Sequence, residues 1–60
     1  MTNEKTYLIN EIKEDLKIKI DLLEAIKNGY NNKEVIQNLE DVIDDLILYS
    51  RLQITNILKA

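Results

Sequence analysis

The chain has no cysteine, no histidine and no proline, and it has a single glycine among 60 residues. Without cysteine no disulfide can stabilise the fold, and without histidine the commonest metal ligand and the usual general base are missing. The only serine, Ser50, has no histidine to activate it as a nucleophile. The sequence therefore predicts no catalytic residue, no metal site and no cofactor, and we expect Ser50 to be a small buried residue.

The chain also lacks a long apolar run and an excess of positive charge. It carries 8 basic and 11 acidic residues, which gives a net charge of −3. This balance disfavours a nucleic-acid partner, because binding to nucleic acid rests on neutralising phosphates with Lys and Arg. No apolar run approaches the about 20 residues of a membrane span, and residues 1–5 lack the apolar segment of a signal peptide. We therefore expect a cytoplasmic protein that does not enter a membrane.

What the chain has in abundance is apolar periodicity. Apolar residues recur at spacings of three or four over residues 4–28 and again over residues 32–58, which is the period of an α-helix. The sequence predicts an all-α fold with one domain over residues 1–60. In this domain two helices, at about 4–28 and about 32–58, form an antiparallel hairpin across a turn at 29–31.

The residues between the two periodic stretches carry strong turn signals. Gly29 is expected to end the first helix in the left-handed conformation, which glycine adopts without steric cost. Asn31 is expected to cap the second helix, with Glu34 three residues later as in a capping box. Tyr30 and Val35 then stand at the positions of a hydrophobic staple. These signals predict a tight turn between the helices.

The apolar face of the second helix is wider than one neighbouring helix can cover. On a helical wheel its apolar residues occupy about half of the circumference, whereas a single partner helix covers a narrower stripe. A chain of this size also gains only about 3–5 kcal/mol from its own core. We therefore expect two hairpins to associate as a homodimer and form a four-helix bundle. The residues expected in the core of this bundle are Ile12, Leu16, Ile20, Leu23, Leu39, Ile43, Leu46 and Ile47.

Lys19 interrupts the apolar stripe of the first helix. A lysine at the edge of a helix contact can lay its carbon chain over apolar neighbours and keep its ammonium group in water. A polar residue within a helix contact can also select the register or the number of associating helices. The sequence leaves both interpretations of Lys19 open.

Four acidic residues crowd the middle of the second helix, and two leucines follow them. Acidic residues four apart on a helix repel each other by about 0.2–0.5 kcal/mol per pair. One interpretation is a solvated surface, partly neutralised by lysines of the first helix such as Lys13, Lys17 or Lys19. The other is a recognition surface for a basic protein. We expect the second alternative to define the partner-binding site. Its candidate residues are Glu40, Asp41, Asp44, Asp45, Leu48 and Leu52.

The segments at residues 29–36 and 42–47 resemble the small sporulation-type aspartyl-phosphate phosphatases, which are two-helix proteins of similar length. Their second helix carries the signature Ser-Gln-x-Leu-Asp. Here Glu40 and Asp41 stand in place of the Ser and the Gln, whereas Ile43 keeps the apolar position and Asp44 keeps the Asp. The resemblance implies dephosphorylation of a response regulator, with Asp44 as the functional carboxylate.

The hairpin layout and the run Leu22-Leu23-Glu24 are also similar to the plasmid repressor-of-primer family. Those proteins are dimers of helical hairpins that bind RNA loops, so this resemblance implies an RNA-binding dimer. The wide apolar face and the acidic residues of the second helix favour a different function. We expect a small non-enzymatic regulator or inhibitor that binds a protein target through its helix faces, in analogy with small acidic phage and plasmid factors.

Overall fold

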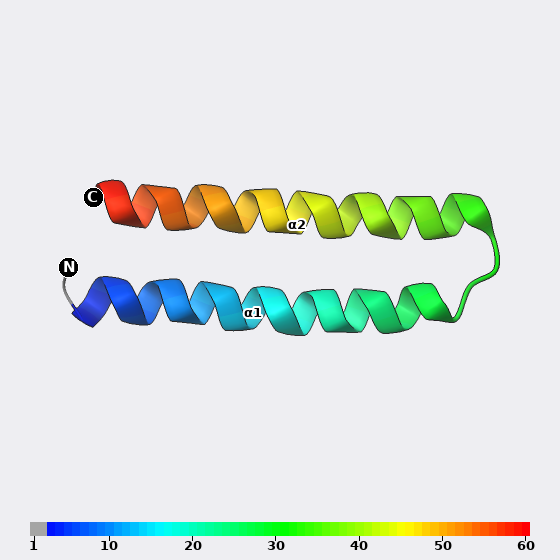
Figure 1. Cartoon of the computed structure of the whole chain (residues 1–60), viewed down its shortest axis with the longest axis horizontal. Helices are drawn as coiled ribbons and strands as arrows, with labels where there is room; N and C mark the ends of the chain where they lie inside the picture. Colours follow the sequence, from blue (N-terminus) through cyan, green and yellow to red (C-terminus); the bar gives the residue numbers. More distant parts are fainter. Residues whose placement is uncertain (1–2) are drawn as a thin grey trace.

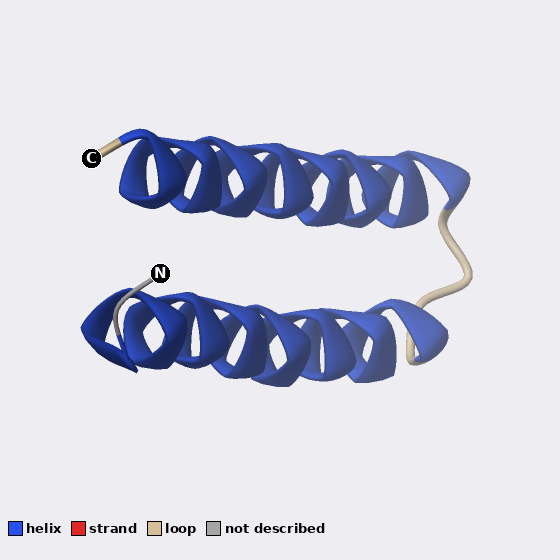
Figure 2. Cartoon of the chain, turned by 60° about the vertical axis from the view of Figure 1, so that its left-hand side comes forward, coloured by secondary structure: helices blue, strands red, loops and turns tan. Residues whose placement is uncertain are grey.

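In a computed structural model the protein folds as two long helices joined by a short turn. The structure describes residues 3–60, in which α1 spans Asn3–Asn28 and α2 spans Lys33–Lys59. The helices lie side by side and antiparallel, so the start of α1 and the end of α2 lie at the same end of the hairpin (Figure 1; the second view, in Figure 2, agrees). The all-α hairpin predicted from the sequence is therefore confirmed.

The helix bounds agree with the predicted ranges to within one residue. The turn is one residue longer than predicted, because α2 begins at Lys33 and not at residue 32. α2 then continues without interruption through Ser50 to Lys59. Over the described residues, neither helix combines the length and the apolar content that crossing a membrane requires.

Gly29 does not adopt the conformation that the sequence predicted for it. Its φ angle is not positive, so the left-handed helix end proposed above is wrong. The end of α1 is closed by bonds that reach back three residues: Gly29 N–H donates to the Ile26 carbonyl at 3.0 Å and Tyr30 N–H to the Lys27 carbonyl at 3.1 Å. Such bonds tighten the last turn into 3₁₀ geometry without a left-handed residue. A Cβ atom at Gly29 would lie 3.4 Å from the Ile26 carbonyl oxygen, which is ordinary contact.

The cap of α2 is Asn32 and not Asn31. The Asn32 backbone is extended, with φ −76° and ψ 121°, and its side-chain oxygen accepts from Glu34 N–H at 2.8 Å and from Val35 N–H at 3.2 Å. This shift moves Glu34 to the second helical position, where its carboxylate still favours the positive end of the helix. It also takes Tyr30 out of the staple position, and the Tyr30 side chain is half exposed. The predicted capping box and staple are therefore wrong by one residue.

The choice between the two asparagines can be tested directly. Asn32→Ala removes the acceptor for two helix N–H groups and should lower the free energy of unfolding by about 1 kcal/mol. Asn31→Ala, the matched control, should change it by less than about 0.5 kcal/mol because its side chain makes no capping bond to α2. Urea unfolding followed by circular dichroism measures both. A larger loss for Asn31→Ala than for Asn32→Ala would contradict the observed cap.

The contact between α1 and α2 follows a seven-residue repeat. Ile36, Ile43, Ser50 and Ile57 recur along the face of α2 that is buried or half-buried against α1. This is the repeat by which two helices stay in contact along their length. Ile9 and Ile43 are the buried apolar residues, and no side chain among the described residues is less than 2% exposed. The residues predicted for the bundle core are half-buried, apart from Ile43, which is buried.

Candidate interaction surfaces

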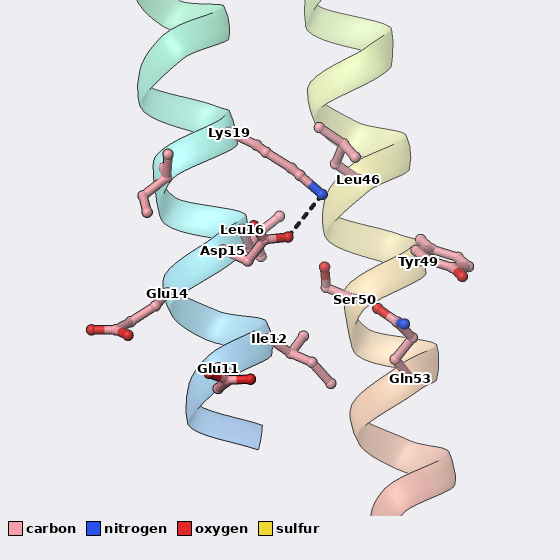
Figure 3. Close-up of a pocket in the computed structure, with 11 residues that line it drawn as sticks. Glu11, Ile12, Glu14, Asp15, Leu16, Lys19, Leu46, Tyr49, Ser50 and Gln53 are labelled. Atoms are coloured by element: carbon pink, nitrogen blue, oxygen red, sulfur yellow. Dashed lines mark ion pairs between the residues drawn. The ribbon is translucent and has the colours of Figure 1, made fainter. Parts of the chain in front are cut away.

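A shallow groove runs between the helices on one face of the hairpin (Figure 3). Its volume is about 500 Å³. Apolar side chains from both helices line it, including Ile12 and Leu16 of α1 and Leu46 of α2. The polar and charged residues that line it are Glu11, Glu14, Asp15, Lys19, Ser50 and Gln53. The groove therefore offers a mixed surface that stays open to solvent.

An ion pair lies at the edge of this groove. Lys19 Nζ is 2.8 Å from Asp15 Oδ2, and the two side chains are 54% and 64% exposed. In Figure 3 the Lys19 side chain extends from α1 toward α2 and ends near Leu46. An exposed pair of this spacing contributes only about 0.3–0.5 kcal/mol to stability. Lys19 thus lies at the edge of the helix contact with its ammonium group in solvent, in agreement with the first of the two interpretations.

Two polar residues occupy positions of the α2 contact repeat. Ser50 is buried, as predicted, and its side chain points toward α1 in Figure 3. Gln53, which sequence reasoning missed, is half-buried and lines the groove. The seven-residue spacing from Leu39 through Leu46 to Gln53 was the signal that could have found it. Two polar side chains of α2 therefore lie among the buried and half-buried residues at this level of the hairpin.

The six predicted partner-binding residues are all exposed, but they do not form one surface. Successive residues of an α-helix are rotated by about 100° around its axis. Four of the six residues follow one another at spacings of four, three and four positions, so they share one stripe of α2. This stripe points away from α1. We call it the outer stripe, and its residues are Asp41, Asp45, Leu48 and Leu52. Leu48 and Leu52 are 57% and 55% exposed.

Glu40 and Asp44 lie on a neighbouring side of α2, closer to α1. The nearby cation on α1 is Lys27, whose Nζ is 3.0 Å from Glu24 Oε2. The pairing with Glu24 raises the pKa of Lys27, and the charge of Glu40 adds to this effect across the hairpin. Glu40 therefore acts on Lys27 across the hairpin.

Two further side-chain bonds act within single helices. Gln37 Nε2 donates to Asp41 Oδ1 at 3.0 Å, which holds the first carboxylate of the outer stripe in place. Tyr7 Oη donates to Glu11 Oε1 at 3.0 Å, and this bond to a carboxylate raises the pKa of Tyr7 above its usual value. Both bonds join residues four apart on exposed helix surfaces, so they order side chains without building a catalytic arrangement.

The fold and these surfaces define a class of protein: a small helical hairpin whose distinctive features are exposed helix faces. Within residues 3–60, no cluster of three or more acidic side chains is arranged to hold a metal ion. In the comparisons with known proteins, no family model, curated protein or solved structure matches the chain.

Proposed function

We propose that the protein is a non-enzymatic regulator that acts as a homodimer and binds a protein target through the outer stripe. In the proposed dimer two hairpins pack into a four-helix bundle. The observation that carries the proposal is the amount of apolar surface that the single hairpin leaves exposed. Among the described residues 3–60, eleven large apolar side chains are more than about a third exposed.

The exposed area supports a dimer quantitatively. The accessible surface of the chain is 4926 Å² for a mass of 7.0 kDa. A compact monomer of this mass exposes about 4,000 Å², so the hairpin exposes about 900 Å² more than expected. A typical stable interface buries about 800 Å² on each partner. The radius of gyration, 14.3 Å, likewise exceeds the about 10 Å expected for a compact chain of this length.

The outer stripe supports the second half of the proposal. It lies on the side of α2 opposite to α1, so it stays accessible when a second hairpin packs beside the first. Asp41 and Asp45 supply negative charge, and Leu48 and Leu52 supply apolar area next to it. Carboxylates of this kind select a basic partner surface and speed its association, while adjacent apolar side chains contribute binding energy on burial.

Charge reversal tests this function on the intact protein. We expect that affinity capture with Asp41→Lys/Asp45→Lys loses the partner that the unmodified protein recovers. Glu40→Lys/Asp44→Lys is the control, since it makes the same charge change on the neighbouring side of α2 and should retain the partner. Circular dichroism verifies that both variants are helical.

The other outcomes of this capture experiment would contradict the role of the outer stripe. Equal recovery by both variants and by the unmodified protein would contradict the role of the outer stripe. Loss confined to Glu40→Lys/Asp44→Lys would also contradict it and would point instead to Asp44, the carboxylate that the phosphatase resemblance implies. A response-regulator domain that is dephosphorylated faster by the protein would then be the readout to follow.

A further inference from the structure

The groove between the helices continues along the hairpin as rows of apolar side chains. Residues seven apart on a helix lie almost on one line, since the drift is only about 20° per seven residues. Asp15 of the groove is therefore in line with Leu8 and Leu22, and Lys19 is in line with Ile26. On α2, Tyr49 of the groove is in line with Val42 and Val35. We call this side of the hairpin the groove face.

The side chains of the groove face are more exposed than a soluble surface requires. Leu22 is 60% exposed, Val42 45% and Tyr49 60%. Leu8 and Ile26 are likewise more than two-fifths exposed. Together with the apolar lining of the groove, they form apolar strips along both helices, which the polar and charged lining of the groove interrupts. Such strips on small proteins mark sites of association.

The opposite face of the hairpin carries charged side chains on α1 and α2. A second, smaller hollow there is lined by Lys13, Lys17 and Asp21 together with Leu16 and Ile20. Further along the same side lie the Glu24–Lys27 ion pair and Glu40, which acts on Lys27 across the hairpin. Burial of these charges in a dimer would require their desolvation, which costs several kcal/mol per ion. The charged face therefore favours contact with water.

We propose that the second copy of the chain docks on the groove face. This inference rests on the proposed dimer and adds to it the surface through which the dimer forms. A symmetric dimer uses the same patch on both copies, so the patch must complement itself. The groove face supports this through its exposed apolar rows, which include Leu22 on α1 and Val42 and Tyr49 on α2. Its groove carries Glu11, Glu14 and Asp15 together with Lys19, so the apolar rows and not the charges support the docking.

The position of the Asp15–Lys19 ion pair along α1 also bears on how the two copies are aligned. Residues 15 and 19 lie close to the middle of α1, which spans Asn3–Asn28. In a dimer with fully overlapping hairpins the two-fold axis passes near the middle of each copy. Where this axis crosses the helices at right angles, α1 of one copy faces α1 of the second copy, and the two Asp15–Lys19 pairs lie near the axis.

Matched substitutions on two faces test the docking surface. Leu22→Glu/Val42→Glu places two carboxylates on the groove face, and Leu48→Glu/Leu52→Glu places two on the outer stripe. We expect the first variant to sediment at the 7.0 kDa of one chain at a concentration where the unmodified protein and the second variant sediment at twice that mass. If the Leu22→Glu/Val42→Glu protein still forms a dimer, the groove face is not the docking surface. The same conclusion follows if only Leu48→Glu/Leu52→Glu dissociates the dimer. A monomeric unmodified protein would instead overturn the proposed dimer itself.

A cross-linking measurement keeps the proposal testable if the first variant fails to fold. The chain has no cysteine, so a single introduced cysteine gives an unambiguous product. Asp15→Cys should form a disulfide-linked dimer on mild oxidation, because residue 15 lies at the middle of α1, next to the proposed two-fold axis, and a disulfide requires Cα atoms less than about 7 Å apart. Leu48→Cys on the outer stripe should stay largely unlinked. Equal cross-linking by the two variants, or faster linking by Leu48→Cys, would overturn the assignment.

Discussion

Ile43→Ala should unfold most of the protein under conditions where the unmodified protein is folded. Ile43 is 7% exposed and is one of the two apolar side chains that are buried among residues 3–60. Truncation of a buried isoleucine to alanine costs about 2–5 kcal/mol, and the single core of a chain this small supplies about 3–5 kcal/mol. Urea unfolding followed by the helical circular dichroism signal should show a loss of this size.

The matched control for this substitution is Leu48→Ala on the same helix. Leu48 is 57% exposed, so its truncation removes little buried area. Alanine also has the highest helix propensity, and the substitution should therefore change the free energy of unfolding by less than about 0.5 kcal/mol. Equal losses for the two variants would mean that the outer side of α2 is as important to the folded state as the contact with α1.

The melting temperature should rise with protein concentration. In a dimer that unfolds to two separate chains, each tenfold increase in concentration adds about 1.4 kcal/mol to the apparent stability, by mass action. With an unfolding enthalpy of about 0.7 kcal/mol per residue over both chains, a hundredfold increase should raise the melting temperature by about 10 °C. Thermal scans by circular dichroism at several concentrations measure this shift.

The groove-face variant Leu22→Glu/Val42→Glu is the control for the concentration series. If it folds, it should melt at a temperature that does not depend on concentration, because a monomer unfolds without a change in the number of chains. The outer-stripe variant Leu48→Glu/Leu52→Glu should keep the concentration dependence of the unmodified protein. A melting temperature of the unmodified protein that is constant over a hundredfold range would contradict the dimer.

The hairpin was predictable because the helical period of the apolar residues extends almost without interruption on both sides of one short polar segment. The details of the turn were not predictable in the same way. Asn31 and Asn32 have the same capping chemistry, and the backbone angles of Asn32, not its residue type, decide that it forms the cap. Gly29 would permit a left-handed residue at the end of α1. The helix instead ends with hydrogen bonds from Gly29 N–H to the Ile26 carbonyl and from Tyr30 N–H to the Lys27 carbonyl, and no left-handed residue is needed.

The candidate surfaces were predictable only in part. The helical period alone places Asp41, Asp45, Leu48 and Leu52 on one stripe, so the separation of Glu40 and Asp44 from it could have been read from the sequence. The groove could not, because it depends on how far Lys19, Tyr49 and Gln53 extend between two helices of a given register. That register follows from the length of the turn, which the sequence left uncertain by one residue.

Sedimentation equilibrium of the unmodified protein at high micromolar concentration tests the central claim most directly. The account predicts a mass of twice the 7.0 kDa of the chain, because a second hairpin must cover the apolar surface that the first leaves exposed. A fit to a single species of 7.0 kDa, with the helical circular dichroism signal intact, would contradict it.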